Sequence, residues 1–210
     1  MYYFIFLISF IGSSGLCALI DFNFPKFRLT KKKNENIYED YKKILPVVVR
    51  NLIISYPIFY YSEYYLFMID NIKNNNYYYY TITYILLWYI LSDLFFYMVH
   101  RFFHTKTFYF LHKKHHEFNN PYGIGAIYCG IMEMVFSNLL SLLLPVYFIE
   151  VPENLVLKMI VGMTFWTVFM SHGCFQEINH SHVIHHRKLT CNYGLFITDR
   201  IFGTKEKKYK

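Results

Sequence analysis

Histidine is the residue type whose spacing in this sequence points most directly to chemistry. The chain has ten histidines. Nine of them form an H-x-x-x-H pair, two H-x-x-H-H groups and one single residue, namely His100 and His104; His112, His115 and His116; His182, His185 and His186; and His172. On a helix, residues three or four positions apart share a face, so each cluster can present several imidazoles to one ion. One such pair often arises by chance, but three clusters with repeated spacing predict a metal site.

The number of histidines favours two ions over one. Imidazole binds Zn, Cu, Fe and Ni, so the ligand type alone leaves the metal open. A structural zinc site closes with four ligands and usually includes cysteine, whereas the four cysteines here (Cys17, Cys129, Cys174 and Cys191) are widely spaced and form no C-x-x-C pair. Nine histidines are too many for one closed site and suit two ions with open coordination positions.

The elements that must position these histidines are apolar. Hydrophobic residues make up 55% of the chain and charged residues 17%, which lies outside the usual range of soluble proteins. A helix that spans a bilayer needs about 20 mostly apolar residues, and five segments approach that length, at 2–20, 44–69, 77–99, 124–149 and 155–170.

The histidine clusters lie at the ends of these segments. We therefore predict an all-α integral membrane bundle of about five spans, with cytosolic histidine-bearing helices that hold a two-metal site. The chain is expected to form a single membrane domain over residues 1–210, with N-terminal spans and a basic loop at 1–92 and a histidine-bearing region at 93–204. A metal transporter is the less favoured alternative, since its ligands would lie near the bilayer midplane.

The charge distribution predicts the orientation. Lys and Arg gather at residues 26–50, 101–114 and 187–210, whereas the loops on the other side hold only Lys73 and Lys158. Because positive residues favour the cytosolic side, this asymmetry predicts cytosolic histidine clusters, a cytosolic C-terminus and a lumenal N-terminus. The net charge of +7 does not indicate a nucleic-acid partner, because the basic residues lie between apolar blocks and near the C-terminus.

Both ends of the sequence carry possible targeting signals. Residues 2–20 could be a cleaved signal peptide, but they lack a preceding basic region, and cleavage would leave the basic loop on the wrong side of the membrane. Lys207 and Lys208, third and fourth from the end, resemble a dilysine retrieval signal and predict residence in the endoplasmic reticulum. The alternative is a basic tail attracted to anionic headgroups.

The motifs around the histidines match a known family. Asp93–Arg101 reads D-L-F-F-Y-M-V-H-R, and Leu111–Gly123 reads L-H-K-K-H-H-E-F-N-N-P-Y-G. N-Y-G follows at Asn192–Gly194 and D-R-I-F-G-T at Asp199–Thr204, preceded by Thr198 where the family pattern has tryptophan. This half of the chain resembles the fatty acid hydroxylase/sterol desaturase superfamily, most closely the methylsterol monooxygenases. In that subfamily a glutamate occupies the position of Glu133.

The resemblance implies an O2-dependent oxidoreductase. It implies two iron ions held by the nine clustered histidines, with electrons from cytochrome b5 and an NAD(P)H-dependent reductase. The implied reaction is oxidation of a lipid C–H bond, with a methylsterol of sterol biosynthesis as the expected substrate. Fatty acyl chains, sphingolipids and ether lipids remain alternatives. The segment Ser171–Cys174 and the short spacing from His172 to His182 depart from the methylsterol oxidase pattern, so the substrate stays open.

Three further polar residues lie near these clusters in the sequence. Asp93 lies seven residues before His100, hence on the same helix face, and an ionisable residue inside a span is commonly functional. We expect it to contact a ligand histidine from outside the metal centre. Glu117, beside His116, could orient a ligand or be solvated. His180 is expected to be a spare polar residue.

Overall fold

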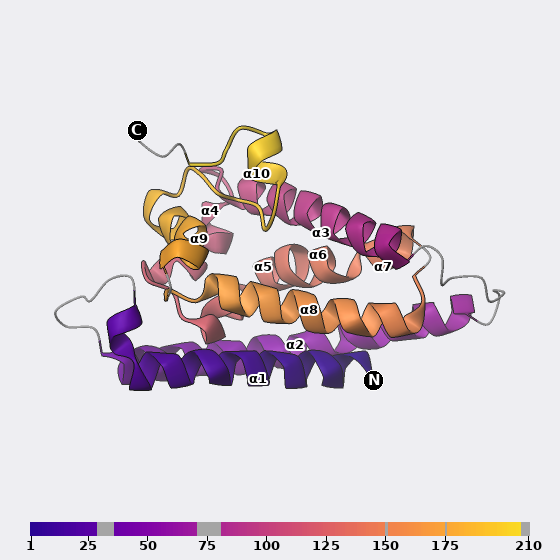
Figure 1. Ribbon diagram of the computed structural model, residues 1–210, viewed down its shortest axis with the longest axis horizontal. Coiled ribbons are helices and arrows are strands. Elements are labelled where there is room, and N and C mark those ends of the chain that lie inside the picture. Colours follow the sequence, from indigo (N-terminus) through magenta and orange to yellow (C-terminus); the bar gives the residue numbers. More distant parts are fainter. Residues whose placement is uncertain (29–35, 71–80, 150, 175, 207–210) are drawn as a thin grey trace.

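Four long helices run along the longest axis of the molecule (Figure 1). The structure is a computed structural model that describes residues 1–28, 36–70, 81–149, 151–174 and 176–206, with the backbone alone for 69, 70 and 176–180. The long helices are α1 (Tyr2–Asn23), α2 (Ile37–Asp70), α3 (Thr81–Phe103) and α8 (Glu153–Ser171). Each is long and apolar enough to cross a membrane. Nearly all of the described part is helical and none of it forms a strand, which confirms the predicted all-α membrane fold.

Shorter elements connect and cap these helices. After α1 comes the 3-10 turn η1 (Pro25–Phe27), and after α3 come α4 (Tyr109–His112), η3 (His115–Glu117) and η4 (Gly123–Ile127). An irregular helical stretch then follows, built from α5 (Ile131–Glu133), the π-helical η5 (Met134–Leu139), α6 (Leu140–Leu143) and α7 (Pro145–Phe148). The chain closes with α9 (Gln176–Lys188) and α10 (Thr198–Ile201).

The predicted fourth span is shorter than its sequence indicates. The apolar helix runs from Ile131 to Leu143, which at 1.5 Å per residue is about 20 Å, less than the roughly 30 Å of bilayer hydrocarbon. The first residues of the predicted span lie outside this helix because α2 binds their backbone. Asn51 Nδ2 donates to the carbonyl oxygens of Ile127 (2.7 Å) and Cys129 (3.1 Å). The five predicted spans are thus four long helices and one short one.

The helix α1 packs inside the bundle along one stripe. Its buried residues recur at intervals of three or four, as expected for one helical face, and are mainly Tyr2, Phe6, Phe10, Ser13, Cys17 and Asp21. Phe6 stacks near Phe59 of α2, with 4.8 Å between ring centroids. The C-terminal end of α1, where this stripe ends at Asp21, lies at the same end of the bundle as α9 (Figure 1).

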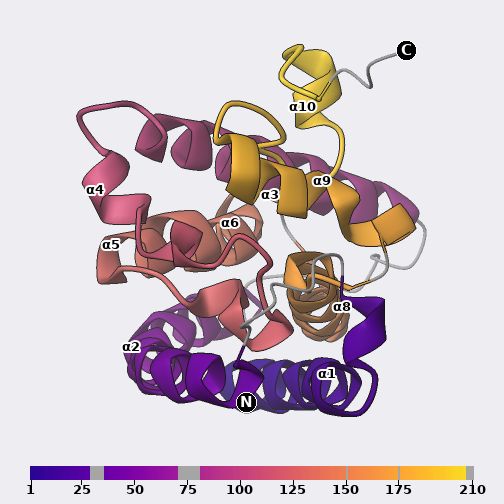
Figure 2. The ribbon, with the colours of Figure 1, turned by 90° about the vertical axis from the view of Figure 1, so that its left-hand side faces the viewer.

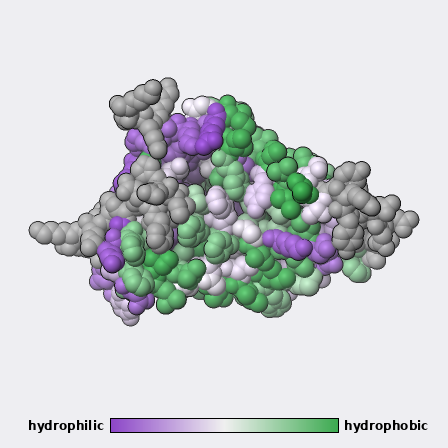
Figure 3. Space-filling view, viewed as in Figure 1, coloured by the Kyte–Doolittle hydropathy of each residue, from purple (hydrophilic) through white to green (hydrophobic). Residues whose placement is uncertain are grey.

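The surface is apolar around the middle of the bundle and hydrophilic at one end. Ile8, Ile53 and Ile82, on α1, α2 and α3, are 71%, 66% and 74% exposed, as suits side chains that face lipid. Hydrophilic residues gather at the end that carries α9 and α10 (Figure 3). Viewed from that end, α4 and α9 lie across the ends of the long helices (Figure 2). The histidine-bearing elements therefore lie where the apolar bundle meets water.

Candidate metal centre

Eight of the nine predicted ligand histidines converge at this end of the bundle. Three separate stretches supply them: the end of α3 and the turn after it, the segment from α4 to η3, and α9. They form two groups whose ligand atoms lie within 4.8 Å of one another, one of five residues (His100, His104, His112, His116 and His185) and one of three (His115, His182 and His186). Each H-x-x-H-H cluster contributes to both groups.

In the group of five, the Nε2 atoms face one another. His116 Nε2 lies 2.8 Å from His112 Nε2 and 3.2 Å from His104 Nε2. His100 Nε2 lies 3.0 Å from His112 Nε2, and His104 Nε2 lies 3.1 Å from His185 Nε2. Two nitrogen ligands about 2.1 Å from one ion at right angles are about 3.0 Å apart, so these separations match a shared ion.

The group of three has the same geometry. His186 Nε2 lies 3.0 Å from His182 Nε2 and 3.2 Å from His115 Nε2. His186 and His182 are four residues apart on α9, which places them on one face. His115 comes from η3 and closes the group from the other side. Three ligands leave coordination positions open, as catalytic metal sites require.

Two of the histidine rings make hydrogen bonds through Nδ1, the nitrogen directed away from the other histidines. These bonds show that a cation fits beside the Nε2 atoms of both rings. His100 Nδ1 lies 2.7 Å from the carbonyl oxygen of Tyr193, and His185 Nδ1 lies 2.7 Å from that of Cys191. A carbonyl oxygen only accepts, so each Nδ1 carries the hydrogen, and the Nε2 of each neutral ring presents a lone pair to its neighbours. Converging lone pairs repel unless a positive ion lies between them, so the donor set fits metal ions.

Burial keeps these imidazoles neutral, the form that binds a metal. It lowers the pKa of His104 to about 2 and that of His112 to about 3. Burial is also the main cause that lowers the pKa of His115 and His185 to about 4. Neighbouring histidines add to the effect because a proton on one ring repels a proton on the next. Near neutral pH the site is therefore a cluster of uncharged donors.

We expect the metal-free protein to lose stability in acid. A histidine with a lowered folded-state pKa contributes stability above its unfolded pKa of about 6.5, and this is lost as the pH falls below that value. With folded-state pKa values near 4, His115 and His185 would each lower the free energy of unfolding by about 2 kcal/mol at pH 5. Thermal unfolding of the chelator-treated protein between pH 7.5 and 4.5 measures the effect. An unfolding temperature that stays constant over that range would contradict the buried, neutral assignment.

Glu133 is a site residue to which the sequence analysis gave no role. It lies in α5, directly before the π-helical turn η5, and is 3% exposed. Its Oε1 lies 2.8 Å from His112 Nδ1 and 4.0 Å from His115 Nδ1, although the first contact lacks the alignment of a hydrogen bond. A carboxylate against a ligand histidine fixes the ring and strengthens its donor nitrogen. The signal in the sequence was a lone carboxylate in an apolar run.

The structure does not bring His172 to the metal centre. His172 follows α8 and is fully buried, with its Nε2 3.0 Å from Asp21 Oδ1. Asp21 also pairs with Arg28 and accepts the hydroxyl of Tyr41 at 2.8 Å. His172 thus differs from the other predicted ligands because its ring nitrogen is directed to a buried carboxylate that joins α1 to the segment between α8 and α9.

Among the described residues, the Asp93 carboxylate accepts hydrogen bonds from backbone amides and not from a histidine. Its carboxylate accepts the N–H groups of residues 195–198 at 2.7 to 3.1 Å, and the hydroxyl of Thr198 at 2.8 Å. A Cβ on Gly194 would lie 2.9 Å from Asp93 Oδ1 and 2.1 Å from Thr198 Oγ1, so only glycine fits there. The link from Asp93 to His100 runs through this loop, which supplies the Tyr193 carbonyl. The expected direct contact is therefore replaced by an indirect one.

Asp93→Asn should destabilise this loop. The amide group would turn an N–H toward backbone donors, and buried hydrogen bonds to a charged acceptor are worth about 1.5–3 kcal/mol each. We expect a loss of roughly 3 kcal/mol in unfolding free energy and faster hydrogen exchange at residues 195–198. The matched variant Asp40→Asn, on α2, should leave exchange in this loop unchanged. Protection in Asp93→Asn equal to that of the native chain would contradict this role.

Glu117 does not contact a ligand histidine among the described residues. It accepts the hydroxyl of Tyr128 at 2.6 Å and pairs with Lys43 at 2.8 Å. These contacts join η3 to α2 and to the loop before α5. Of the two readings of Glu117, the one in which it orients a ligand gains no support from these contacts. The side chain of His180 lies outside the described residues.

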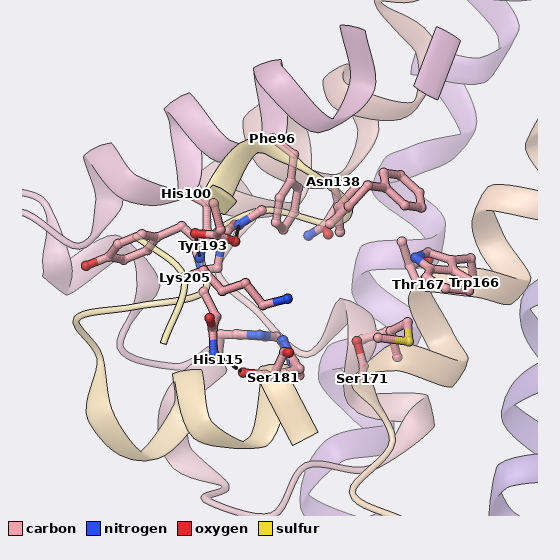
Figure 4. A pocket seen from close by; sticks show the side chains of 18 of the residues that line it. Phe96, His100, His115, Asn138, Trp166, Thr167, Ser171, Ser181, Tyr193 and Lys205 are labelled. Atoms are coloured by element: carbon pink, nitrogen blue, oxygen red, sulfur yellow. Dashed lines mark hydrogen bonds between the residues drawn. The ribbon is translucent and has the colours of Figure 1, made fainter. Parts of the chain in front are cut away.

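A cavity of about 330 Å³ opens beside both histidine groups (Figure 4). His100, His112, His115 and His182 contribute to its wall on one side. Trp166 lies on the other side (Figure 4), and Phe96 packs beside His100, with 5.0 Å between ring centroids. The structure thus places a histidine cluster with the geometry of metal ligands beside a partly open cavity at the end of the apolar bundle. This arrangement defines the class of a helical membrane protein with a candidate metal site.

Comparison with known proteins gives the family of the chain. The family model described as fatty acid hydroxylase matches residues 85–204, which is more than half of the chain and contains all eight converged histidines. The chain belongs to the fatty acid hydroxylase family. This confirms the superfamily that the sequence motifs resemble. No solved structure matches the chain.

Curated relatives span several activities. The chain is 28% identical over 206 residues to fatty acid hydroxylase ahd1 of Mycosarcoma maydis, covering 91% of this chain and 54% of that protein. It is 25% identical over 125 residues to very-long-chain aldehyde decarbonylase GL1-11 of Oryza sativa subsp. indica, covering 58% and 47%. It is 28% identical over 136 residues to a Dictyostelium discoideum protein predicted to be a methylsterol monooxygenase, covering 58% and 50%. The chain spans about half the length of these relatives.

Proposed function

We propose that the protein is an O2-dependent lipid oxidase whose two histidine groups each hold one iron ion. The observation that supports this most directly is the convergence of eight imidazoles, with their Nε2 atoms facing one another, into a group of five and a group of three. The family is iron-dependent, and imidazole suits iron among other metals. Of the nine histidines predicted as ligands, His172 is left out of this assignment because it is bonded to Asp21.

Iron bound in such a centre supplies O2 activation and oxidation of an unactivated C–H bond. The chain's own residues hold and orient the centre. Glu133 lies beside His112, while Tyr193 and Cys191 orient His100 and His185 through their carbonyl oxygens. The cavity would place a lipid beside these rings. Electrons would come from a cytochrome b5-type donor and an NAD(P)H-dependent reductase.

The substrate we expect from the sequence motifs is a methylsterol. Fatty acyl lipids are the alternative, and a relative that covers most of this chain is named as a fatty acid hydroxylase. The cavity has the size of an ordinary small-molecule site, since such sites run from about 300 to 1,000 Å³. Its volume alone does not separate the two classes.

The test of the function is turnover in defined membranes. The iron-loaded protein, reconstituted with cytochrome b5, its reductase and NADPH, should convert an added lipid to an oxidised product that mass spectrometry detects. Product formation should require O2 and should disappear in His112→Ala, which removes a ligand from the group of five. Failure of the iron-loaded protein to oxidise methylsterols, fatty acids and sphingolipids alike would overturn the proposal.

The membrane placement is also a proposal, with residence in the endoplasmic reticulum, a lumenal N-terminus and a cytosolic C-terminus. The candidate signal at Lys207 and Lys208 lies outside the described residues. A glycosylation acceptor inserted between α2 and α3 should be modified, whereas one placed after Lys205 should not, because glycosylation occurs in the lumen. Modification at the second position would reverse the orientation and move the histidine groups to the lumenal side.

A further inference from the structure

The cavity beside the histidine groups has a cationic rim. Lys205 and Arg200 both line it, and the amine of Lys205 points into the open space (Figure 4). Among the described residues, no hydrogen bond or ion pair occupies the Lys205 Nζ atom or the Arg200 guanidinium. The Lys205 ammonium and the Arg200 guanidinium therefore border the cavity that the histidine groups also line.

The two carboxylates that line the cavity do not neutralise this rim. Asp199 accepts the N–H groups of Tyr193 and Gly194 at 2.8 and 2.7 Å, and the hydroxyl of Thr204 at 2.7 Å. Glu133 lies against His112. In the described part of the chain, no ion pair joins either carboxylate to Lys205 or Arg200, so both cations remain available to an anionic ligand.

The backbone holds Lys205 in place. Its N–H donates to the Asp199 carbonyl oxygen at 3.0 Å, and the N–H of Thr204 donates to the same oxygen at 2.9 Å. The next residue, Glu206, pairs with Lys188 of α9 at 2.7 Å. These bonds fix the point from which the side chain enters the cavity, which lowers the cost of ordering a ligand there.

An apolar extension leads away from the rim into the bundle. A second cavity of about 50 Å³ shares five lining residues with the first, namely Phe96, Ala126, Asn138, Thr167 and Leu195. Beyond these it is bounded by apolar side chains such as Phe10 of α1, Leu142 of α6 and Met163 of α8. The combined space is charged at one end and narrow and apolar at the other.

We propose that Lys205, assisted by Arg200, binds the anionic headgroup of an acyl lipid whose chain enters the apolar extension. The headgroup is a carboxylate or a phosphate, since both accept charge-assisted hydrogen bonds from an ammonium. The ring system of a methylsterol carries a neutral hydroxyl and would leave both cations uncompensated. This assignment concerns binding and rests on the proposed function, of whose two candidate substrate classes it selects the acyl lipids over the methylsterols.

Binding to the purified full-length protein in detergent tests this inference directly. The probes are palmitate, 1-palmitoyl lysophosphatidate, hexadecanol and a 4-methylsterol, each tritiated. Lys205→Met should weaken binding of the anionic lipids about tenfold or more, as expected for a lost charged hydrogen bond, and should leave hexadecanol binding unchanged. Lys205→Arg should restore most of the affinity. The control Lys158→Met, an exposed cation on α8, should change nothing.

The pattern across probes identifies the source of the charge. A loss confined to palmitate indicates a carboxylate ligand, a loss confined to lysophosphatidate indicates a phosphate, and a loss of both supports the shared chemistry. Unchanged anionic-lipid binding in Lys205→Met, or methylsterol binding by the native chain as tight as that of palmitate, would overturn the inference. Retained hexadecanol binding shows that the variant is folded. Metal content and turnover are measured separately, so a protein that binds palmitate through Lys205 but oxidises no lipid would overturn the proposed function alone.

Discussion

Replacing His186 with alanine should lower the iron content from about two ions per chain to about one and abolish lipid oxidation. His186 provides one of three nitrogens in the smaller group, and two histidines alone do not hold a divalent ion firmly at neutral pH. The group of five should keep its ion, because none of its Nε2 separations involves His186. Elemental analysis of the purified variant, normalised to protein, gives the result.

The matched control is His172→Asn, the predicted ligand that the structure directs to Asp21. An asparagine keeps a donor near Asp21, so we expect full metal content and somewhat lower stability. A loss of metal in His172→Asn equal to that in His186→Ala would show that the grouping is wrong. Zinc can occupy these sites after heterologous expression because affinity alone does not select iron, so total metal is the quantity to compare.

The histidine clusters were predictable because their geometry is local. Residues His182 and His186 share a face of α9 by helical periodicity alone, and the same holds for the pair His100 and His104 at the end of α3. The return of the third cluster to the same end of the bundle also followed, since two apolar segments lie between it and the second. What the spacing left undetermined was the division into five and three, which depends on how η3 turns His115 away from His116.

The residues whose predicted contacts differ from the observed ones bond to partners that are distant in sequence. His172 bonds to a residue 151 positions away, and Asp93 to amides more than 100 positions away. Position on a helix face shows where such a side chain points but not which element meets it. Asp93 does lie on the same face as His100, as predicted, yet its carboxylate accepts hydrogen bonds from the loop after Tyr193. The length of the fourth span was overestimated for a similar reason, because a side chain of α2 donates hydrogen bonds to the backbone before Ile131.

The buried cluster around Asp21 connects parts of the chain that the metal centre needs. Asp21, on α1, bonds to Arg28 after that helix and to His172 before α9. Arg28 also donates to the carbonyl oxygen of Asn120 at 2.8 Å, in the loop that follows η3. The cluster therefore ties α1 both to the segment after the second histidine cluster and to the segment before the third.

Asp21→Asn should accordingly be one of the most destabilising single changes in the chain. The side chains of Asp21, Arg28 and His172 are at most 1% exposed, and removing one partner of a buried ion pair costs about 3–5 kcal/mol because the other charge stays buried. The double variant Asp21→Asn/Arg28→Met should lose less stability than the two single variants added together, since it leaves neither charge alone. Thermal unfolding in detergent measures all three. Additive losses would mean that the pair is not coupled, and α9 would then have to be held in place by its own packing.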